Sequence, residues 1–340
     1  MGDSENKLPF VTAAVVNWNG VKYLPECLRS LRAQEGVRLE VIVVDNASSD
    51  GSVDFVRAFY PEARVVENQE NRGYAGALNQ AVESMRGDSL LTLNTDISLA
   101  PRFVAELARC IRDHQAERCG YAMGKVCLMT AEGEPTGRLY STGHLLARNR
   151  LVYNRGSGQI DRGQYDREER IPGANAAALL IRREMLEDLR TETGVFDELF
   201  FLYGSDVDFD WLAACRGWAC YYCPTAVCRH VSEGSSQISR QGFDAPFINA
   251  RFLMMIKNDR LGDVLRDLPF IVKRNIVDLA PKIRRKPSLL WSIPLHLART
   301  VGRALASRRR TRHLRRRPAT NMREWFRWST RLLRESARYG

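Results

Sequence analysis

Leu90-Leu91-Thr92-Leu93-Asn94-Thr95-Asp96 is the clearest strand signal in this chain. Its apolar and β-branched residues predict a buried strand that ends in polar side chains. In an open α/β sheet, ligands bind beyond the carboxyl ends of the strands. Asn94 and Asp96 are two residues apart and therefore point the same way in an extended chain. An amide oxygen and a carboxylate on one side suit Mg²⁺ or Mn²⁺ carrying a diphosphate, although a turn capped by Asn and Asp fits the same residues.

Three apolar runs precede this strand, and helical patterns separate them. The runs cover residues 9–16, 39–44 and 64–67, and apolar residues recur at helical spacing over 23–33, 53–59 and 73–85. Strands that alternate with helices at this spacing predict βαβ units. We therefore expect a Rossmann-like α/β fold with a mostly parallel central sheet flanked by helices.

Polar loops follow the predicted strands and should meet at one edge of the sheet. The side chains in these loops are Asn17 and Asn19 after the first strand, Asp45 and Asn46 after the second, and Arg72 and Gly73 before the third helix. Gly73 allows close approach of the backbone, and the helix that follows it offers free N–H groups to an anion. The glycine spacing matches neither a dinucleotide fingerprint nor a P-loop, and a glycine here is equally explained as loop punctuation.

The charges are divided unevenly along the 340 residues, whose formal net charge is +11. From Arg251 onward, 24 Lys and Arg accompany 6 Asp and Glu, so this part carries +18 and the first 250 residues carry −7. The first seven residues lack the pattern of a signal peptide, and no run reaches the roughly 18 apolar residues of a membrane-spanning helix. We therefore expect a cytosolic protein whose 8 cysteines are free thiols.

Four motifs in this order resemble those of family 2 glycosyltransferases, and most closely those of the bacterial rhamnosyltransferase-like enzymes of cell-surface polysaccharide assembly. They are Val15-Val16-Asn17-Trp18-Asn19-Gly20, Val43-Val44-Asp45-Asn46-Ala47-Ser48-Ser49-Asp50-Gly51-Ser52, Asn71-Arg72-Gly73-Tyr74-Ala75-Gly76-Ala77-Leu78-Asn79 and Leu93-Asn94-Thr95-Asp96. The resemblance covers residues 9–255. It implies the GT-A fold, a nucleoside-diphosphate-sugar donor and inversion at the anomeric carbon.

The resemblance also implies roles in donor binding. Asp45 matches the carboxylate that contacts the nucleobase, and the loops of Asn17 and of Arg72-Gly73 match those around base and ribose. The segment 171–181, which contains Gly173, matches the stretch that lines the donor and acceptor pocket. Tight packing is an equally good explanation for the small residues of that segment.

Asn94-Thr95-Asp96 matches the family's D-x-D motif, with Asn in place of the first Asp. The resemblance therefore implies that Asp96 holds the divalent ion and that Asn94 assists. One negative charge fewer should weaken metal binding in the absence of the donor, so we expect the ion to arrive with the diphosphate. His230, with Gly234 and Ser235, matches the family's late His-x-x-x-Gly-Ser pattern, which implies a metal ligand or a diphosphate contact. A packed, hydrogen-bonded histidine is the alternative.

Ser205-Asp206-Val207-Asp208 matches the family's Glu-Asp-Val-Asp signature, in which Asp206 takes the place of the catalytic Asp. Inverting transfer needs a general base that removes a proton from the acceptor hydroxyl. Asp208 is the second candidate, although both fit helix-terminal carboxylates without a catalytic role. Ser205 replaces the family's Glu, and Leu212 replaces an Arg, so the details of acceptor binding differ here.

Two later segments carry other expectations. Residues 145–169 are charged and aperiodic, which is typical of a mobile loop over a site.

Residues 217–230 resemble an edge strand broken by Pro224. Cys220 and Cys223 form C-x-x-C near Cys228 and His230, a set that suggests zinc. Residues three apart on a strand face opposite sides, however, so packed free thiols are the default expectation.

The domain expectation is a catalytic domain over 1–255 and a basic helical region over 256–340. The short apolar run 289–295 is split by Pro294, and residues 322–339 place arginines on one helical stripe and Trp325 with Phe326 near another. This pattern is typical of a helix that lies at an anionic membrane surface. Nucleic-acid binding would use the same charge and is less favoured; a solvated helical cap is the plain alternative.

Together these observations predict a metal-dependent, inverting glycosyltransferase at the inner face of the cell membrane, to which it binds peripherally. It would move a sugar such as rhamnose to a lipid-linked or polysaccharide acceptor. One alternative is a protein that binds nucleotide sugars without transfer. Another is a sugar nucleotidyltransferase, which should have a Gly- and Lys/Arg-rich loop where this chain has Asn17-Trp18-Asn19-Gly20.

Overall fold

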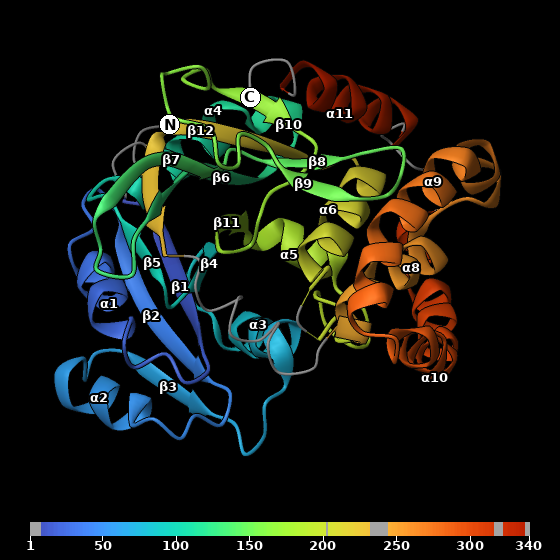
Figure 1. Ribbon diagram of the computed structural model, residues 1–340. Helices are drawn as coiled ribbons and strands as arrows, with labels where there is room; N and C mark the ends of the chain where they lie inside the picture. Colours follow the sequence, from blue (N-terminus) through green and yellow to red (C-terminus); the bar gives the residue numbers. More distant parts are fainter. Residues whose placement is uncertain (1–7, 202, 232–243, 316–321, 337–340) are drawn as a thin grey trace.

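The computed structural model describes residues 8–201, 203–231, 244–315 and 322–336. One sheet of ten strands crosses this part of the chain. Eight strands follow the order β10-β12-β6-β11-β4-β1-β2-β3, with β5 paired to β12 and β7 paired to β6. A separate two-stranded hairpin and four C-terminal helices complete the described architecture (Figure 1).

The amino-terminal half of the sheet is parallel. It consists of β1 (Phe10–Asn17), β2 (Arg38–Asp45), β3 (Arg64–Glu67) and β4 (Ser89–Asn94), connected by α1 (Leu24–Arg32), α2 (Ser52–Phe59) and α3 (Gly73–Ser84). The strands and helices expected from apolar spacing are thus confirmed. The chain reverses its direction across the sheet after β3, so α3 lies on the opposite side from α1 and α2 (Figure 1). Loops after all four strands meet at one edge.

The remaining half of the sheet is mixed. It contains β5 (Ile97–Leu99), β6 (Cys119–Met129), β7 (Pro135–Ser141), β10 (Glu169–Ile171), β11 (Ala178–Arg182) and β12 (Ala219–His230). β11 runs antiparallel between β4 and β6, whereas β12 is parallel to β6. Helices α4 (Phe103–Asp113), α5 (Arg183–Leu189) and α6 (Ser205–Arg216) and the short η1 (Gln115–Glu117) accompany these strands.

The expectation that residues 217–230 form an edge strand is wrong. β12 pairs with β6 along one side, and with β10 and β5 along the other. Pro224 lies in the register shift between Cys223 and Val227, where the ladder is interrupted. A proline without an N–H group is therefore tolerated inside the sheet.

Residues 145–169 are not simply a loop. β8 (His144–Leu146) and β9 (Val152–Asn154) form an antiparallel hairpin, and β10 follows it. The N–H of His144 donates to the carbonyl of Gly173 at 2.8 Å, and the N–H of Thr142 donates to the carbonyl of Arg155 at 2.9 Å. These bonds fix the hairpin beside the 171–181 segment.

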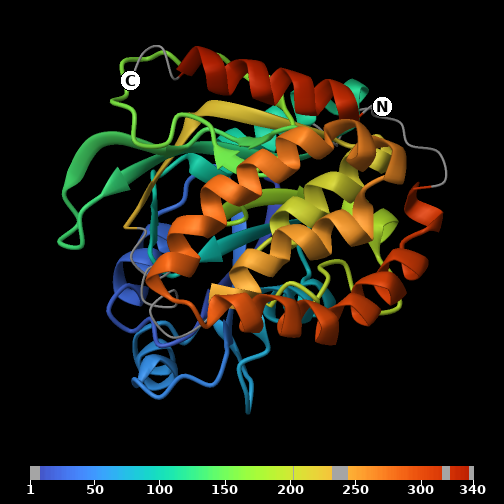
Figure 2. The same ribbon diagram turned by 45° about the vertical axis from the view of Figure 1, so that its right-hand side comes forward.

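The C-terminal region is a layer of helices packed on the hairpin and α6. It contains α8 (Asp244–Asn258), α9 (Leu261–Arg285), α10 (Leu289–Arg310), the short η2 (His313–Arg315) and α11 (Met322–Ser336). In Figure 2, α8, α9 and α10 lie together while α11 passes beside β8. The boundary expected between 255 and 256 falls inside α8.

Helix α11 is docked on the body of the protein. Phe326 is buried, and its ring contacts Trp211 of α6 edge-on at 5.5 Å between centroids. This pair belongs to a second hydrophobic core that α6 shares with the C-terminal helices. Phe326, expected to help anchor a membrane-facing helix, therefore faces the interior because burial against α6 removes its apolar surface from water.

Arg150, at the tip of the β8–β9 hairpin, fastens the hairpin to the helical layer. Its side chain is fully buried. Its Nε lies 2.6 Å from Oδ2 of Asp259, and its Nη1 lies 2.9 Å from Oδ2 of Asp267. The guanidinium also lies 4.0 Å from the centroid of the Phe326 ring. One cation thus joins the hairpin to the connection between α8 and α9, to α9 and to α11.

Replacing Arg150 by leucine should lower the free energy of unfolding by about 3 kcal/mol, because it leaves Asp259 buried without its cation. Urea unfolding of both proteins would measure the difference. Arg29→Leu is the control, since Arg29 forms only an exposed pair with Glu26. Equal stability of the two variants would contradict this role of Arg150.

Candidate functional site

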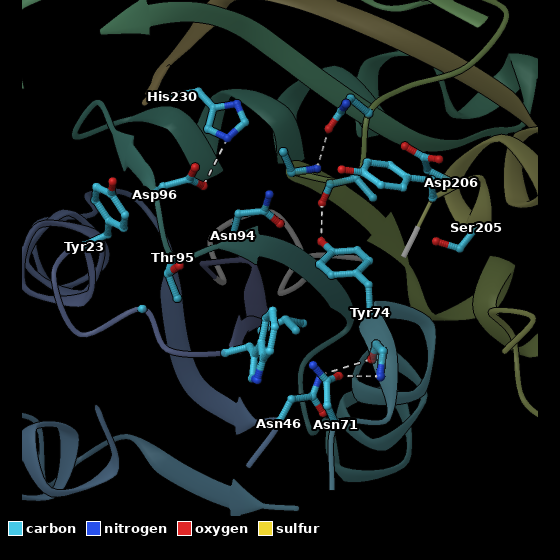
Figure 3. A pocket seen from close by; sticks show the side chains of 18 of the residues that line it. Tyr23, Asn46, Asn71, Tyr74, Asn94, Thr95, Asp96, Ser205, Asp206 and His230 are labelled. Atoms are coloured by element: carbon cyan, nitrogen blue, oxygen red, sulfur yellow. Dashed lines mark hydrogen bonds and ion pairs between the residues drawn. The ribbon is translucent and has the colours of Figure 1, made fainter. Parts of the chain in front are cut away.

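A cavity of about 320 Å³ lies beyond the carboxyl ends of β1 and β4 (Figure 3). The residues expected from the sequence that line it are Asn19, Asn46, Gly73, Asn94, Asp96, Asp206 and His230. Asp96 and Asp206 approach the cavity from opposite sides (Figure 3). Side chains more than 100 positions apart in the chain thus meet in one chamber.

Asp96 and His230 form one wall of the cavity. Oδ1 of Asp96 lies 3.1 Å from Nε2 of His230, and both side chains are buried. They meet because His230 pairs with Ile97 where β12 contacts β5. The other ring nitrogen, Nδ1 of His230, has no hydrogen-bond partner within the described ranges. A carboxylate and an imidazole are a common ligand pair for a divalent metal. Gly234 and Ser235 lie outside the described residues.

Asp206 forms the opposite wall. It lies in the first turn of α6. This helix begins directly after Gly204, whose φ of +94° is left-handed. The side chain is 22 % exposed, so its carboxylate is accessible from the cavity. The geometry thus fits a base that meets a ligand hydroxyl.

Asn17 and Asp45 lie beneath the cavity rather than in its wall. Both are almost fully buried. Nδ2 of Asn17 donates to Oδ1 of Asp45 at 2.6 Å, and the N–H of Ser48 donates to Oδ2 of Asp45 at 2.9 Å. Asp45 is not among the residues that line the cavity, and its contact with a nucleobase stays a prediction. Both residues hold the loop that carries Asn19 and Asn46.

Arg72 and Gly73 have different positions. Gly73 lines the cavity with φ of +71°, and a Cβ atom there would lie 2.3 Å from the carbonyl oxygen of Phe201. Only glycine fits this turn. Arg72 is not among the lining residues and lies 3.6 Å from Glu198 in an ion pair on the surface. The structure therefore does not place Arg72 against a donor.

Gly173 supports a buried carboxylate instead of lining the cavity. A Cβ atom at this position would lie 2.1 Å from Oδ2 of Asp210. The adjacent N–H of Ala174 donates to Oδ1 of Asp210 at 3.1 Å. The absence of a side chain at Gly173 thus allows the backbone to bind Asp210, and the expected role in substrate binding stays a prediction.

Asp208 does not reach the cavity. Its side chain is buried on the other face of α6, where Oδ2 lies 2.5 Å from Nζ of Lys257 and Oδ1 accepts from Asn258 at 2.6 Å. Burial raises the pKa of Asp208, and the Lys257 ammonium opposes that rise. The structure therefore places Asp208 in a buried ion pair outside the cavity wall, and its role as a second base stays untested.

Among the described residues, Cys220 and Cys223 do not belong to one group of metal-ligand type. Cys223 faces α4, where its Sγ lies 3.5 Å from Nη2 of Arg109, and Cys220 lies near Tyr121 on β6. All eight cysteines are free thiols, as expected. The described residues contain one three-membered group of metal-ligand type, which is Cys110, His114 and Glu168. Glu168 in this group already pairs with Arg109 at 2.7 Å.

Aromatic rings form much of the remaining wall, and sequence reasoning assigned them no role. They are Trp18, Tyr23, Tyr74, Tyr140 and Tyr203. The hydroxyl of Tyr74 donates to the carbonyl of Ala176 at 2.7 Å, and burial raises the pKa of Tyr74. Trp18 and Tyr74 lie inside the quoted motifs, so the sequence could have indicated that they line the cavity. Tyr140 enters from β7, which no motif predicted.

Comparison with known proteins identifies relatives of this chain. A model of the family described as glycosyl transferase family 2 matches residues 12–190, more than half of the chain. The succinoglycan biosynthesis protein ExoO of Rhizobium meliloti is 30% identical over 141 residues, 41% of this chain and 39% of that protein. The N-acetylglucosaminyl-diphospho-decaprenol L-rhamnosyltransferase of Mycobacterium tuberculosis is 25% identical over 248 residues, 65% of this chain and 76% of that protein.

Two solved structures share the fold. GalNAc-T7 with UDP, GalNAc and Mn²⁺ superimposes with a TM-score of 0.57 at 15% identity, covering 74% of this chain and 48% of that one. The mannosyltransferase PcManGT from Pyrobaculum calidifontis with GDP-Man and Mn²⁺ gives 0.50 at 21% identity, covering 98% and 81%. The chain spans less than half the length of the first relatives it matches.

Asp208→Asn should lower the free energy of unfolding by about 2 kcal/mol without weakening nucleotide binding, because it removes one partner of a buried ion pair outside the cavity. Thermal melting and calorimetric nucleotide titration would measure the two effects. Ser205→Ala is the matched control on the same helical turn. Loss of nucleotide binding in a folded Asp208→Asn protein would contradict the assignment.

Proposed function

Because the chain belongs to glycosyl transferase family 2 and has the GT-A fold expected from its motifs, we propose that it is an inverting glycosyltransferase. Its donor is a nucleoside-diphosphate sugar, and its acceptor is a lipid-linked sugar or a polysaccharide. The observation that carries the proposal is one cavity with Asp96 and His230 on one wall and Asp206 on the other. A protein that only binds a nucleotide sugar has no need of a base opposite the diphosphate site.

The cavity suits a nucleotide sugar in its shape and chemistry. Aromatic rings such as Trp18 and Tyr74 offer flat apolar faces to a base or a sugar, while Asn19, Asn46 and Asn94 offer amide groups. Helix α3 begins at Gly73 in the cavity wall, so the positive end of its dipole favours a nearby anion, although the N–H groups of Gly73 and Tyr74 already donate to Asn71 and Phe201. These side chains line the cavity, and Asp45 lies beneath them, where it accepts hydrogen bonds from Asn17 and Ser48.

The residues around Asp96 fit a divalent ion. Asp96, His230 and the amide oxygen of Asn94 are the groups that would hold Mg²⁺ or Mn²⁺, and the unpartnered Nδ1 of His230 shows that this buried imidazole is not satisfied by the described protein alone. When bound, the ion would neutralise charge on the leaving diphosphate. The two matched structures named above contain Mn²⁺.

Asp206 is the proposed base. It accepts the proton of the acceptor hydroxyl while that oxygen bonds to the anomeric carbon, and the bond from this carbon to the diphosphate breaks with its electron pair leaving on the diphosphate. Attack from the side opposite the leaving group inverts the configuration. Rhamnose is the first donor sugar to test, because the M. tuberculosis relative is named a rhamnosyltransferase.

The C-terminal helices support a further part of the proposal, which is peripheral binding to an anionic membrane. Helix α9 buries Asp263 and Asp267 and exposes apolar side chains on its outer face, the reverse of an ordinary surface helix. These side chains, the α9 stripe, are Leu261, Leu265, Leu268, Val272 and Ile276. No helix within the described ranges is long and apolar enough to cross a membrane.

Basic residues accompany the α9 stripe. Exposed cations near its end are Lys282, Arg284, Arg285 and Lys286, and Trp291 of α10 is 78 % exposed. Each basic residue near an anionic leaflet contributes about 1 kcal/mol. Apolar side chains, an exposed tryptophan and adjacent cations together fit a lipid interface better than a nucleic acid, which offers no apolar surface to the stripe.

Asp206→Asn should abolish sugar transfer and leave donor affinity within about twofold, because it removes the proton acceptor but keeps the shape of the side chain. Product formation and calorimetric donor binding would be measured together. Asp188→Asn, outside the cavity, is the control. Full turnover by Asp206→Asn would exclude Asp206 as the base, and donor binding without any transfer by the wild type would favour a sensor.

Asn94→Asp should strengthen the binding of Mn²⁺ in the absence of nucleotide by at least roughly tenfold, because a second carboxylate raises the negative charge of the proposed site. Electron paramagnetic resonance of free Mn²⁺ would measure the affinity. Asn71→Asp adds the same charge elsewhere in the cavity and should have little effect. Equal gains in both variants would place the ion away from Asp96.

The double substitution Leu265→Glu and Ile276→Glu should release the protein from vesicles that contain anionic lipid, because it places two charges in the α9 stripe. Co-sedimentation with vesicles would measure binding. Phe59→Glu on α2 changes an equally exposed aromatic side chain on another part of the protein and is the control. Unchanged vesicle binding by the double variant would refute the proposed surface.

A further inference from the structure

A buried chain of three titratable side chains runs from the cavity into the protein. Asp206 and Asp210 lie four residues apart on α6 and therefore on the same helical face. His144 of β8 lies between them: its Nε2 is 3.7 Å from Oδ2 of Asp206, and its Nδ1 is 2.9 Å from Oδ2 of Asp210. Only Asp206 lines the cavity; His144 and Asp210 are buried behind it.

Asp210 is held firmly at the inner end of this chain. Its Oδ1 accepts a hydrogen bond from the hydroxyl of Tyr121 at 3.0 Å, and the N–H of Ala174 donates to the same carboxylate. Gly173 has no side chain to displace it. With these donors in place, Asp210 orients the imidazole of His144 through Nδ1 and leaves Nε2 directed toward Asp206.

The titratable side chains near His144 come from α6, β6, β12 and α3. Helix α6 contributes Asp206 and Asp210, and β6 contributes Tyr121, whose pKa burial raises. Strand β12 contributes Cys220 beside Tyr121, and α3 contributes Tyr74 near Asp206. These last three groups are neutral near pH 7, so the charge around His144 is set by the two carboxylates.

The two carboxylates favour a protonated imidazole. Burial lowers the pKa of His144, but the hydrogen bond to Asp210 and the charge of Asp206 outweigh burial and raise it above its usual value. Burial raises the pKa of Asp210 to about 6, opposed by His144 and reinforced by repulsion from Asp206. The cation between them lets both carboxylates stay ionised at neutral pH, which two buried like charges otherwise resist.

We propose that His144, oriented by Asp210, is a positioning residue that holds the carboxylate of Asp206 ionised and directed at the acceptor hydroxyl. The inference rests on the proposed glycosyltransferase function. Without the imidazolium, Asp206 and Asp210 repel one another, and one of them retains a proton near neutral pH. A proton shared between the two carboxylates lowers the fraction of molecules in which Asp206 can accept the acceptor's proton. Donor binding on the other wall of the cavity does not depend on His144.

The pH dependence of transfer tests this role. In the wild type, turnover falls at acid pH as the carboxylates take up protons, and at alkaline pH as His144 loses its own. His144→Gln keeps a hydrogen-bond donor near Asp206 but removes the charge. It should move the acid limb of the kcat profile upward by at least about one pH unit, which lowers kcat roughly tenfold on that limb, with the donor KM unchanged.

His114→Gln is the matched control. His114 also lies between two carboxylates, 3.2 Å from Glu117 and 2.8 Å from Glu168, but it is not in the cavity wall and does not contact α6 residues Asp206 or Asp210. Its kcat profile should superimpose on that of the wild type. A His144→Gln profile that also superimposes on the wild type would overturn the inference while leaving the proposed function intact, whereas absence of transfer by the wild type would refute that function.

A second measurement does not require turnover or a folded His144 variant. The chain has 5 histidines, so NMR of the protein labelled in its imidazole rings, assigned with single-histidine substitutions, can follow each one through a pH titration. His144 should titrate above the usual range of a histidine in the wild type, and its titration midpoint should fall in Asp210→Asn. A neutral His144 throughout the range from pH 5 to pH 8 would exclude the proposed charge.

Discussion

The pairing of β12 with β6 and β5 is the constraint on which the site depends. β12 is the last strand of the sheet in the sequence, yet its carboxyl end lies against the short strand that directly follows Asp96. This register places His230 beside Asp96 across 134 residues of chain. A shift of one residue would turn the imidazole to the other face of the sheet, because side chains alternate along a strand. Sheet register, rather than local sequence, therefore assembles this wall.

Much of the first half of the fold could be predicted because its signals are local. Apolar runs identified β1 to β4, and the polar residues after them identified the edge where the cavity lies. The motifs placed Asp96, Asp206 and His230 correctly in the cavity wall, although their chemical roles stay predictions. Asp45 and Asp208 could not be judged from sequence, because whether a carboxylate faces a ligand or a buried partner is decided by tertiary contacts such as Lys257.

In the C-terminal region, the sequence pattern predicts that a segment is helical more reliably than it predicts which face of the helix is buried. The arginine stripe and aromatic residues of α11 indicated a membrane-facing helix, but Phe326 is buried against α6. The apolar residues that remain exposed belong to α9, which turns its acidic residues inward because Arg148, Arg150 and Arg323 are there to receive them. Charge pairing in the interior therefore determined which face of α9 meets the solvent.

One short hairpin links these two regions mechanically. His144, at the start of β8, contacts the proposed base, and Arg150, six residues later, pairs with Asp259 after α8 and with Asp267 of α9. A tilt of the helical layer relative to the sheet would pull on Arg150 and be transmitted along β8 to the imidazole. The hairpin therefore couples the proposed base to the helices that carry the proposed membrane surface, so that binding at one could be felt at the other.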